Sequence, residues 1–249
     1  MKILLVNDDG FGAPGIESLL KACARRGHET VLVAPKEQQS AMSHRFTLNR
    51  PLLLQEKPCA YPGCRTYALE GSPADCVRIG VHHLCNGKPD VLLSGINKGT
   101  NSGTAVYYSG TFSAAMEGAF LYVPSIAVSI HQDAPLECVD ALAEYAVNEA
   151  EKAAVTGFPR STVLNLNAPA VPWIGEKSCP LDGAYFTDSY QRRENPWGGS
   201  YFWMLPGDNV LEPADPGSDN DYLSRGYLTR SLVGGFHALK EENFPGQGQ

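Results

Sequence analysis

The feature that most constrains the fold is an alternation, over the first two-thirds of the chain, of short apolar runs with longer amphipathic stretches. The apolar runs have the length and branched side chains of β-strands and lie at 2–6, 29–35, 89–95, 124–130 and 161–169. The amphipathic stretches have helical spacing and lie at 15–27, 72–84, 111–120 and 135–155. Because repeated strand–helix–strand units form a parallel sheet with helices on both faces, the sequence predicts an α/β fold.

The character of the chain changes after Pro169. The region 171–249 is rich in proline, glycine and aromatic residues and lacks helical spacing, so we expect it to form hairpins and arms, with 161–169 as the last strand of the sheet. This division predicts a core domain over 1–170 and a separate C-terminal region over 171–249.

Composition excludes several functional classes. The net charge is -7 and no basic stripe is present, which argues against binding to a nucleic-acid duplex. The apolar runs are too short to span a membrane, and the N-terminus lacks the layout of a signal peptide. The 7 cysteines are odd in number and form no CxxC pair, so we expect free thiols and a cytoplasmic protein.

Polar side chains follow the predicted strands at the points where these strands end. Asp8 and Asp9 follow the first strand, a polar loop with Ser40 follows the second, Asn97 follows the strand at 89–95, and Asn165 and Asn167 end the last. The carboxyl ends of parallel strands share one edge of a sheet, where ligands bind. Carboxylate, hydroxyl and amide oxygens suit Mg²⁺ or Mn²⁺, and such a cation would relieve the repulsion between the two aspartates. The alternative is that Asp8 caps a helix and Asp9 lies in a solvated Asp-Gly turn.

The stretch 97–120 places small polar residues before a predicted helix. Its first turn, Ser109-Gly110-Thr111, offers amide hydrogens and hydroxyl groups that favour an anion. The stretch is neither a Walker loop nor a GxGxxG fingerprint, and ordinary helix capping is the alternative. Beside a cation site, a phosphate-binding role is the better interpretation. His44, in the loop with Ser40, is either a proton carrier or simply exposed.

Read together, these clusters resemble the SurE family of stationary-phase survival proteins, which are metal-dependent 5'(3')-nucleotidases. The stretches that carry the resemblance are ILLVNDDGFGAPGI (3–16), GHETVLVAPKEQQSAMSH (27–44), GSPADCV (71–77), PDVLLSGINKGTN (89–101), YSGTFSAAMEGAF (108–120), PSIAVS (124–129) and LNLNAP (164–169). They follow one another in the family's order and cover most of residues 1–170.

The resemblance implies a Rossmann-like core, a C-terminal region used in homodimers or homotetramers, and hydrolysis of nucleoside monophosphates. It implies one divalent metal ion per subunit, Mg²⁺ or Mn²⁺. The residues that match the metal ligands are Asp8, Asp9, Ser40 and Asn97, with the two aspartates also catalytic, and those that match the phosphate pocket are Asn101, Ser109, Gly110 and Thr111. The chain departs from many members at Glu37-Gln38-Gln39, where an arginine is usual.

Two other functions remain open at this stage. A non-catalytic protein that binds nucleotides or sugar phosphates would share the anion site, but it would not need the adjacent acidic pair. An NAD-dependent oxidoreductase is disfavoured, because the glycine fingerprint is missing and no acidic residue ends the second strand.

Overall fold

The predicted alternation of strands and helices is confirmed in the computed structural model, which describes residues 1–183, 189–205 and 214–234. Its strands are β1 (Lys2–Val6), β2 (Glu29–Pro35), β3 (Leu54–Lys57), β4 (Cys64–Leu69), β5 (Val91–Lys98), β6 (Ser125–Ile130), β7 (Thr162–Ala168), β8 (Glu176–Ser178), β9 (Ser189–Glu194), β10 (Ser200–Leu205) and β11 (Leu228–Gly234). Its helices are α1 (Pro14–Arg25), α2 (Pro73–Ile79), α3 (Gly110–Phe120), α4 (Leu136–Thr156) and α5 (Asp219–Ser224). A π-helical turn, η1 (Gly80–Leu84), extends α2, and a 3₁₀ segment, η2 (Gly103–Tyr107), precedes α3.

The main sheet has the strand order β3-β4-β2-β1-β5-β6-β7-β11-β8. The six central strands, from β4 to β7, are parallel to one another, and all of the crossovers between them except that from β2 to β4 contain a helix. From β1 the chain first builds outward through β2 and then returns to add β5 on the other side. The two directions therefore diverge between β1 and β5, and such a switch point, at the carboxyl ends of the strands, is where α/β folds of this kind bind ligands.

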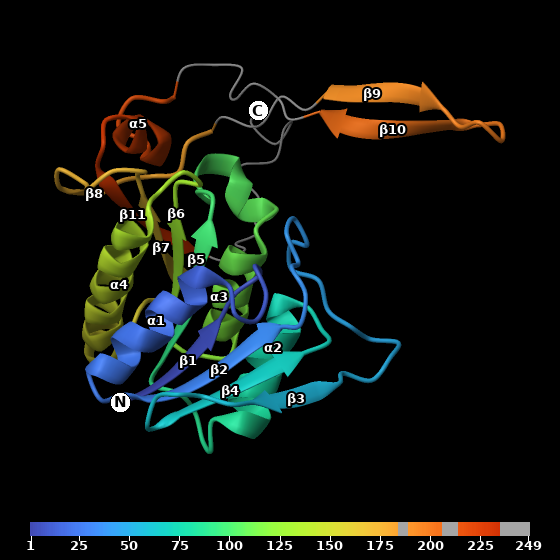
Figure 1. The fold of residues 1–249 in the computed structure, drawn as a ribbon. Coiled ribbons are helices and arrows are strands. Elements are labelled where there is room, and N and C mark those ends of the chain that lie inside the picture. Colours follow the sequence, from blue (N-terminus) through green and yellow to red (C-terminus); the bar gives the residue numbers. More distant parts are fainter. Residues whose placement is uncertain (184–188, 206–213, 235–249) are drawn as a thin grey trace, which may run out of the picture.

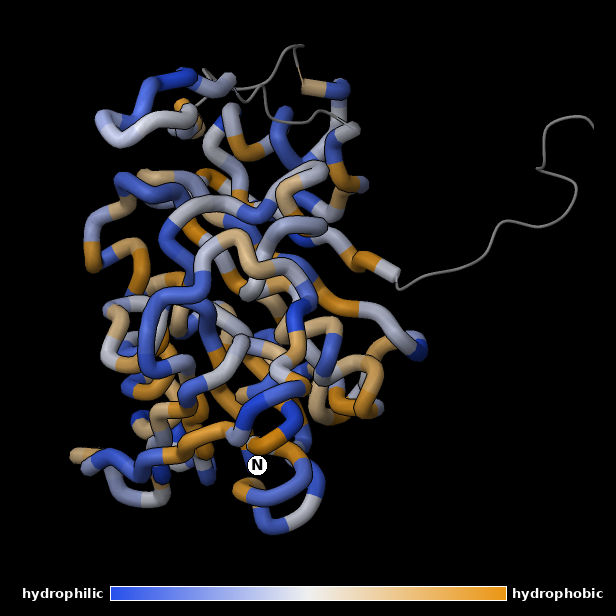
Figure 2. The backbone as a smooth tube through the Cα atoms, turned by 90° about the vertical axis from the view of Figure 1, so that its right-hand side faces the viewer, coloured by the Kyte–Doolittle hydropathy of each residue, from blue (hydrophilic) through white to orange (hydrophobic). Residues whose placement is uncertain are grey.

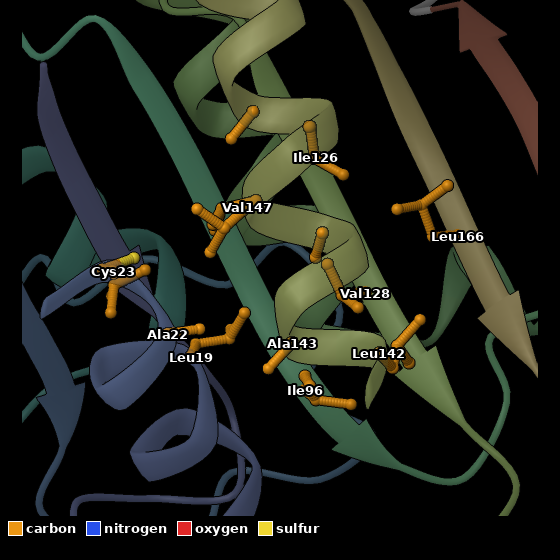
Figure 3. Close-up of a cluster of buried hydrophobic side chains, with 14 of the residues drawn as sticks. Leu19, Ala22, Cys23, Ile96, Ile126, Val128, Leu142, Ala143, Val147 and Leu166 are labelled. Carbon is orange, nitrogen blue, oxygen red and sulfur yellow. The ribbon is translucent and has the colours of Figure 1, made fainter. Parts of the chain in front are cut away.

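Alternate residues of each central strand enter two different cores. Ile3 and Leu5 of β1 pack into a cluster with α1 and α4, whereas Leu4 and Val6 pack into a second cluster with α2 and α3. The two helical layers thus cover opposite faces of the sheet (Figure 1). Figure 3 shows side chains of α1, α4, β5, β6 and β7 converging in the first cluster. Each fully buried leucine stabilises the fold by roughly 1.5–3 kcal/mol.

Helix α2 begins at the start of the stretch predicted at 72–84, with a capping box. The Ser72 hydroxyl accepts a hydrogen bond from the Asp75 N–H at 3.1 Å, and the Asp75 carboxylate accepts one from the Ser72 N–H at 2.9 Å. Pro73 occupies the first helical position, where its missing N–H costs nothing.

Two expectations about the C-terminal region are wrong, one about the last strand of the sheet and one about the lack of helices. Strand β7 is not the last strand, because β11 pairs with it in antiparallel orientation and β8 adds to β11. The region also contains a helix, α5, whose six residues are too few to show helical spacing. Its start signal is local: the Ser218 hydroxyl accepts from the Asp221 N–H at 3.3 Å.

The expected hairpin is present. Strands β9 and β10 pair in antiparallel orientation and project from the body of the molecule (Figure 1). The other predicted arm segments, 184–188, 206–213 and 235–249, lie outside the described residues. The boundary after residue 170 stays a prediction.

Short apolar stretches alternate with polar ones along the coloured part of the trace in Figure 2, which covers the described residues. None of the helices in the described part of the chain combines the length and the apolar character needed to cross a membrane.

Candidate active site

The acidic pair lies at the switch point of the sheet. Asp8 and Asp9 follow the last residue of β1, and β5, the parallel neighbour of β1, ends with Asn97 and Lys98. The Asp9 Oδ2 atom accepts a hydrogen bond from the Lys98 N–H at 3.2 Å, which joins the two strand ends directly. The predicted gathering of polar residues at this edge therefore occurs for the residues that follow β1 and those that end β5.

Asp8 is buried against the N-terminus of α3. Its Oδ1 atom accepts a hydrogen bond from the Thr111 hydroxyl at 2.5 Å, and the Thr111 backbone amide also donates to this carboxylate. Burial raises the pKa of Asp8 from 3.8 to about 6, and the nearby Asp9 raises it as well, while the hydrogen bonds from Thr111 lower it. The carboxylate is therefore held by a helix N-terminus but remains short of positive charge.

Gly110 makes this close approach possible. A Cβ atom at this position would lie 2.8 Å from Asp8 Cβ and 2.9 Å from Asp8 Oδ2. Contacts below 3.0 Å force neighbouring atoms to move, so only glycine allows the first turn of α3 to rest on the aspartate. Gly110, which the resemblance assigns to phosphate binding, thus has a packing role in this structure.

Asp9 is partly buried and has a more polar environment. Burial raises its pKa, whereas the Lys98 N–H, the Lys98 charge and a hydrogen bond from the Gln38 side chain lower it. Gln38 also donates from Nε2 to the Ser40 hydroxyl at 2.9 Å. One glutamine side chain therefore connects Asp9 to Ser40.

The loop with Ser40 is fixed to the site on both sides. Before Ser40, the Gln39 N–H donates to the Asp8 carbonyl at 2.7 Å. After it, Ser43 donates from its N–H to the Tyr108 carbonyl at 3.1 Å and from its hydroxyl to the Tyr107 carbonyl at 2.7 Å. Ser40 is exposed between these two attachments and is linked to Asp9 through the Gln38 side chain, and its role as a metal ligand stays a prediction.

Asn97 follows an irregularity in β5. The register between β5 and β6 shifts between Ser94 and Asn97, which is a β-bulge and changes the direction of the side chains that follow it. The Asn97 Nδ2 atom donates to the Gly99 carbonyl at 2.7 Å. This hydrogen bond uses the nitrogen end of the amide and leaves its oxygen end for another partner.

The residues predicted to bind phosphate have structural partners. Ser109 caps α3 and accepts from the Phe112 N–H at 3.0 Å, so the ordinary capping role occurs. The Thr111 hydroxyl is committed to Asp8. The anion that this helix N-terminus holds in the structure is therefore the Asp8 carboxylate, and binding of a substrate phosphate here stays a prediction.

Asn165 and Asn167 do not join the acidic pair. Both are buried and contact Asn101, which itself is only 7% exposed. Asn167 Oδ1 accepts from the Asn101 N–H at 2.8 Å, and Asn165 Nδ2 donates to the Asn101 carbonyl at 2.8 Å. Asn165 and Asn167 thus support the loop after β5 and are not candidate metal ligands.

His44 also has its partner outside the acidic pair. Its Nε2 atom lies 2.8 Å from Oε2 of Glu117, a carboxylate buried about two turns along α3, and Arg78 pairs with the same carboxylate at 2.7 Å. The His44 ring also stacks on Phe120. This cluster, which sequence reasoning missed, attaches the Ser40 loop to α3 and does not favour His44 as the proton donor. The signal available in the sequence was a lone glutamate, Glu117, among small and apolar residues of a predicted helix.

The donor set fits a hard divalent cation. Asp8 and Asp9 supply two carboxylates whose pKa values are raised, and Asn97 and Ser40 supply neutral oxygens. Among the described residues there is no group of three or more histidine, cysteine, aspartate or glutamate side chains that could hold a metal. Any cation here would thus have two carboxylates together with neutral oxygens, the combination that Mg²⁺ and Mn²⁺ accept.

Comparison with known proteins places this chain in a family. A family model described as survival protein SurE matches residues 3–194. The chain is 39% identical over 245 residues to a protein named 5'-nucleotidase SurE from Thermosipho melanesiensis, an alignment covering 97% of this chain and 94% of that relative. A protein of the same name from Fervidobacterium nodosum is 40% identical over 235 residues, covering 92% and 89% of the two chains.

The fold agrees with that of a solved relative. The crystal structure of the SurE protein from Aquifex aeolicus superposes with a TM-score of 0.77 at 31% identity, covering 94% of this chain and 93% of that one. The family match, the identities and the shared fold confirm the resemblance found in the sequence. The chain belongs to the SurE family of survival proteins.

Proposed function

We propose that this protein is a divalent-metal-dependent 5'-nucleotidase, which hydrolyses nucleoside monophosphates to nucleoside and phosphate and accepts 3'-monophosphates as well. The observation that carries the proposal is the acidic pair Asp8–Asp9 at the switch point of the sheet, with Asp8 held by the N-terminus of α3. The names of the relatives from Thermosipho melanesiensis and Fervidobacterium nodosum support the nucleotidase activity.

The proposed cation is one Mg²⁺ or Mn²⁺ per subunit, held by Asp8, Asp9, Ser40 and Asn97. When bound, such a cation supplies Lewis-acid polarisation of the phosphoryl group and of a water nucleophile. Its positive charge would also offset part of the net charge of -7, which repels an anionic substrate.

The chain's own residues orient these groups. Thr111 fixes the rotamer of Asp8 through its hydroxyl, and the Lys98 N–H fixes Asp9. One of the two carboxylates accepts the proton of the attacking water. We assign the Lys98 ammonium, whose charge already acts on Asp9, and the Asn101 and Ser109–Thr111 segment to contacts with the phosphoryl oxygens, where preorganised donors stabilise the transition state most.

Hydrolysis and metal dependence are tested in one assay. The purified protein is treated with EDTA and mixed with a panel of nucleoside 5'- and 3'-monophosphates, and released phosphate is measured before and after addition of Mg²⁺ or Mn²⁺. We expect activity only with added metal and none in Asp8→Asn. Phosphate release that persists in EDTA would refute the metal-dependent mechanism, and phosphate binding without release would favour the non-catalytic binding protein.

Self-association is part of the proposal. The hairpin β9–β10 exposes a set of large apolar side chains, namely Tyr190, Trp197, Tyr201, Phe202, Trp203, Met204 and Leu205. A two-stranded hairpin is marginally stable alone in water, and an apolar surface of this kind is typical of an interface. We therefore assign it to contact with a second copy, in a homodimer or homotetramer.

Light scattering on the wild type and on a Phe202→Asp/Trp203→Asp double variant tests this assignment. A smaller particle for the variant is the expected result, and an unchanged mass would contradict it.

The proposed compartment is the cytoplasm, which the seven free thiols support.

A further inference from the structure

A short segment, Asn101–Gly103, lies between the end of β5 and the start of η2, and it begins with Asn101, the first of the predicted phosphate-binding residues. Its inner side is fixed by buried side chains of β6 and β7. Asn167 and Asn165 bind the Asn101 N–H and carbonyl, and Asn101 Nδ2 donates to the Ser129 hydroxyl at 2.8 Å. The position of this segment is thus determined by hydrogen bonds to its backbone as well as to its side chain.

Its outer side is held by a residue from the C-terminal region. Asp219, the first residue of α5, is 0% exposed, and its Oδ2 atom accepts from the Gly103 N–H at 2.9 Å. Its Oδ1 atom accepts from the N–H of Asp182 at 2.8 Å and from that of Asn220 at 2.9 Å. One carboxylate therefore joins three separate parts of the chain.

The contact is close as well as polar. Gly103 has a φ of +52°, and a Cβ atom there would lie 3.1 Å from the Asp182 carbonyl oxygen and 3.2 Å from Asn220 Nδ2. The backbone of Gly103 therefore lies directly against the C-terminal region. Burying an ionisable carboxyl group is costly, and burial raises the pKa of Asp219, although its three backbone hydrogen bonds lower it. Because all three hydrogen bonds to the buried Asp219 carboxylate come from backbone N–H groups, this side chain can fix the path of the chain.

We propose that Asp219 is a positioning residue of the active site, which clamps Gly103 and so makes phosphate binding by the Asn101–Thr111 segment depend on the docking of α5. The catalytic part of this inference rests on the proposed function. The clamp itself does not, since it concerns only the order of the segment.

The test compares Asp219→Asn with Asp221→Asn, a matched control in the same turn of α5. The asparagine at 219 keeps one acceptor oxygen but replaces the other with a donor, so at least one of the three N–H groups loses its partner. Asp221 accepts from the Gly217 N–H at 2.9 Å and pairs with Arg225 at 3.3 Å, contacts that stay within the α5 region. We expect Asp219→Asn to raise KM for a nucleoside monophosphate by about tenfold, with kcat changed by less than about threefold, and Asp221→Asn to leave both near wild type.

Amide hydrogen exchange provides the second measurement. Peptides that cover residues 101–107 should exchange faster in Asp219→Asn than in the wild type or Asp221→Asn, while peptides from β1 and β2 remain protected. If Asp219→Asn does not fold, Gly103→Ala tests the same contact from the other side and should give the same two changes.

Unchanged exchange at 101–107, or faster exchange without a rise in KM, would overturn the proposal. Loss of kcat alone would also overturn it, since it would indicate a role other than positioning for substrate binding. A wild type that releases no phosphate with added metal would refute the proposed function, and the exchange data would then decide on the clamp alone.

Discussion

The substitution Asp8→Asn, which removes the charge of this side chain, should make the metal-free protein more stable and should abolish its activity. The pKa of this carboxyl is about 6 in the folded chain and 3.8 without the fold, a difference that corresponds to about 3 kcal/mol of folding free energy. Because the folded state holds the proton more tightly, this stability is fully present below pH 3.8 and is lost as the pH rises through about 6. At pH 7.5 the wild type therefore carries the whole penalty of a buried, underpartnered anion.

The assay is urea unfolding of the wild type and Asp8→Asn in EDTA between pH 4 and pH 8. Asparagine retains an oxygen that can accept the hydrogen bonds from Thr111 but has no charge to desolvate. We expect the variant to be more stable than the wild type by about 1–3 kcal/mol at pH 7.5, and the difference to disappear near pH 4. Added Mn²⁺ should stabilise the wild type and have little effect on the variant.

The matched control is Asp133→Asn, which removes the same charge from a side chain that is 75% exposed. It should change stability by less than about 0.5 kcal/mol at every pH. An Asp8→Asn variant that is less stable than the wild type at pH 7.5, or whose advantage is the same at all pH values, would refute the reasoning, since the cost would then not come from ionisation of Asp8.

Three further predictions concern the support of the site. Gly110→Ala should destabilise the fold by about 1–3 kcal/mol and reduce activity because its Cβ would meet Asp8, whereas Gly175→Ala, whose Cβ would meet the Tyr227 ring at 3.4 Å, should be tolerated in the same thermal melt. Arg78→Met should cost more stability in urea than Glu117→Gln, because it leaves the buried Glu117 carboxylate with one partner fewer; equal costs would count against this. Asn165→Leu should lower the stability by about 1–3 kcal/mol and speed hydrogen exchange at Asn101, since the buried carbonyl of Asn101 loses a donor.

The sequence predicts best what depends on neighbouring residues in the chain. Strands such as 2–6 and 29–35 have the predicted bounds, because a continuous apolar run in a parallel sheet is a local signal. Helix α2 also begins in the predicted stretch 72–84, because its cap, Ser72, and its first residue, Pro73, are adjacent in the sequence. The clustering of Asp8, Asp9 and Asn97 follows from the geometry of parallel strands alone.

Features that depend on distant parts of the chain could not be read from the sequence. Nothing local to Asp219 indicates that its carboxylate accepts from Gly103, and nothing local to His44 indicates that its partner is Glu117. The anion site at Thr111 was predicted from a real property of helix N-termini, but the group that occupies it comes from the same chain. Which anion binds at the N-terminus of α3 therefore depends on the tertiary fold.

The pairing of β11 with β7 has a consequence for synthesis of the protein on the ribosome. Strand β7 ends at residue 168, and its outer neighbour begins only at residue 228. Until that late segment has emerged, the nascent chain presents the unpaired edge of β7, which is a template for pairing with other chains. Premature termination before Leu228 should therefore yield insoluble product instead of a smaller folded protein.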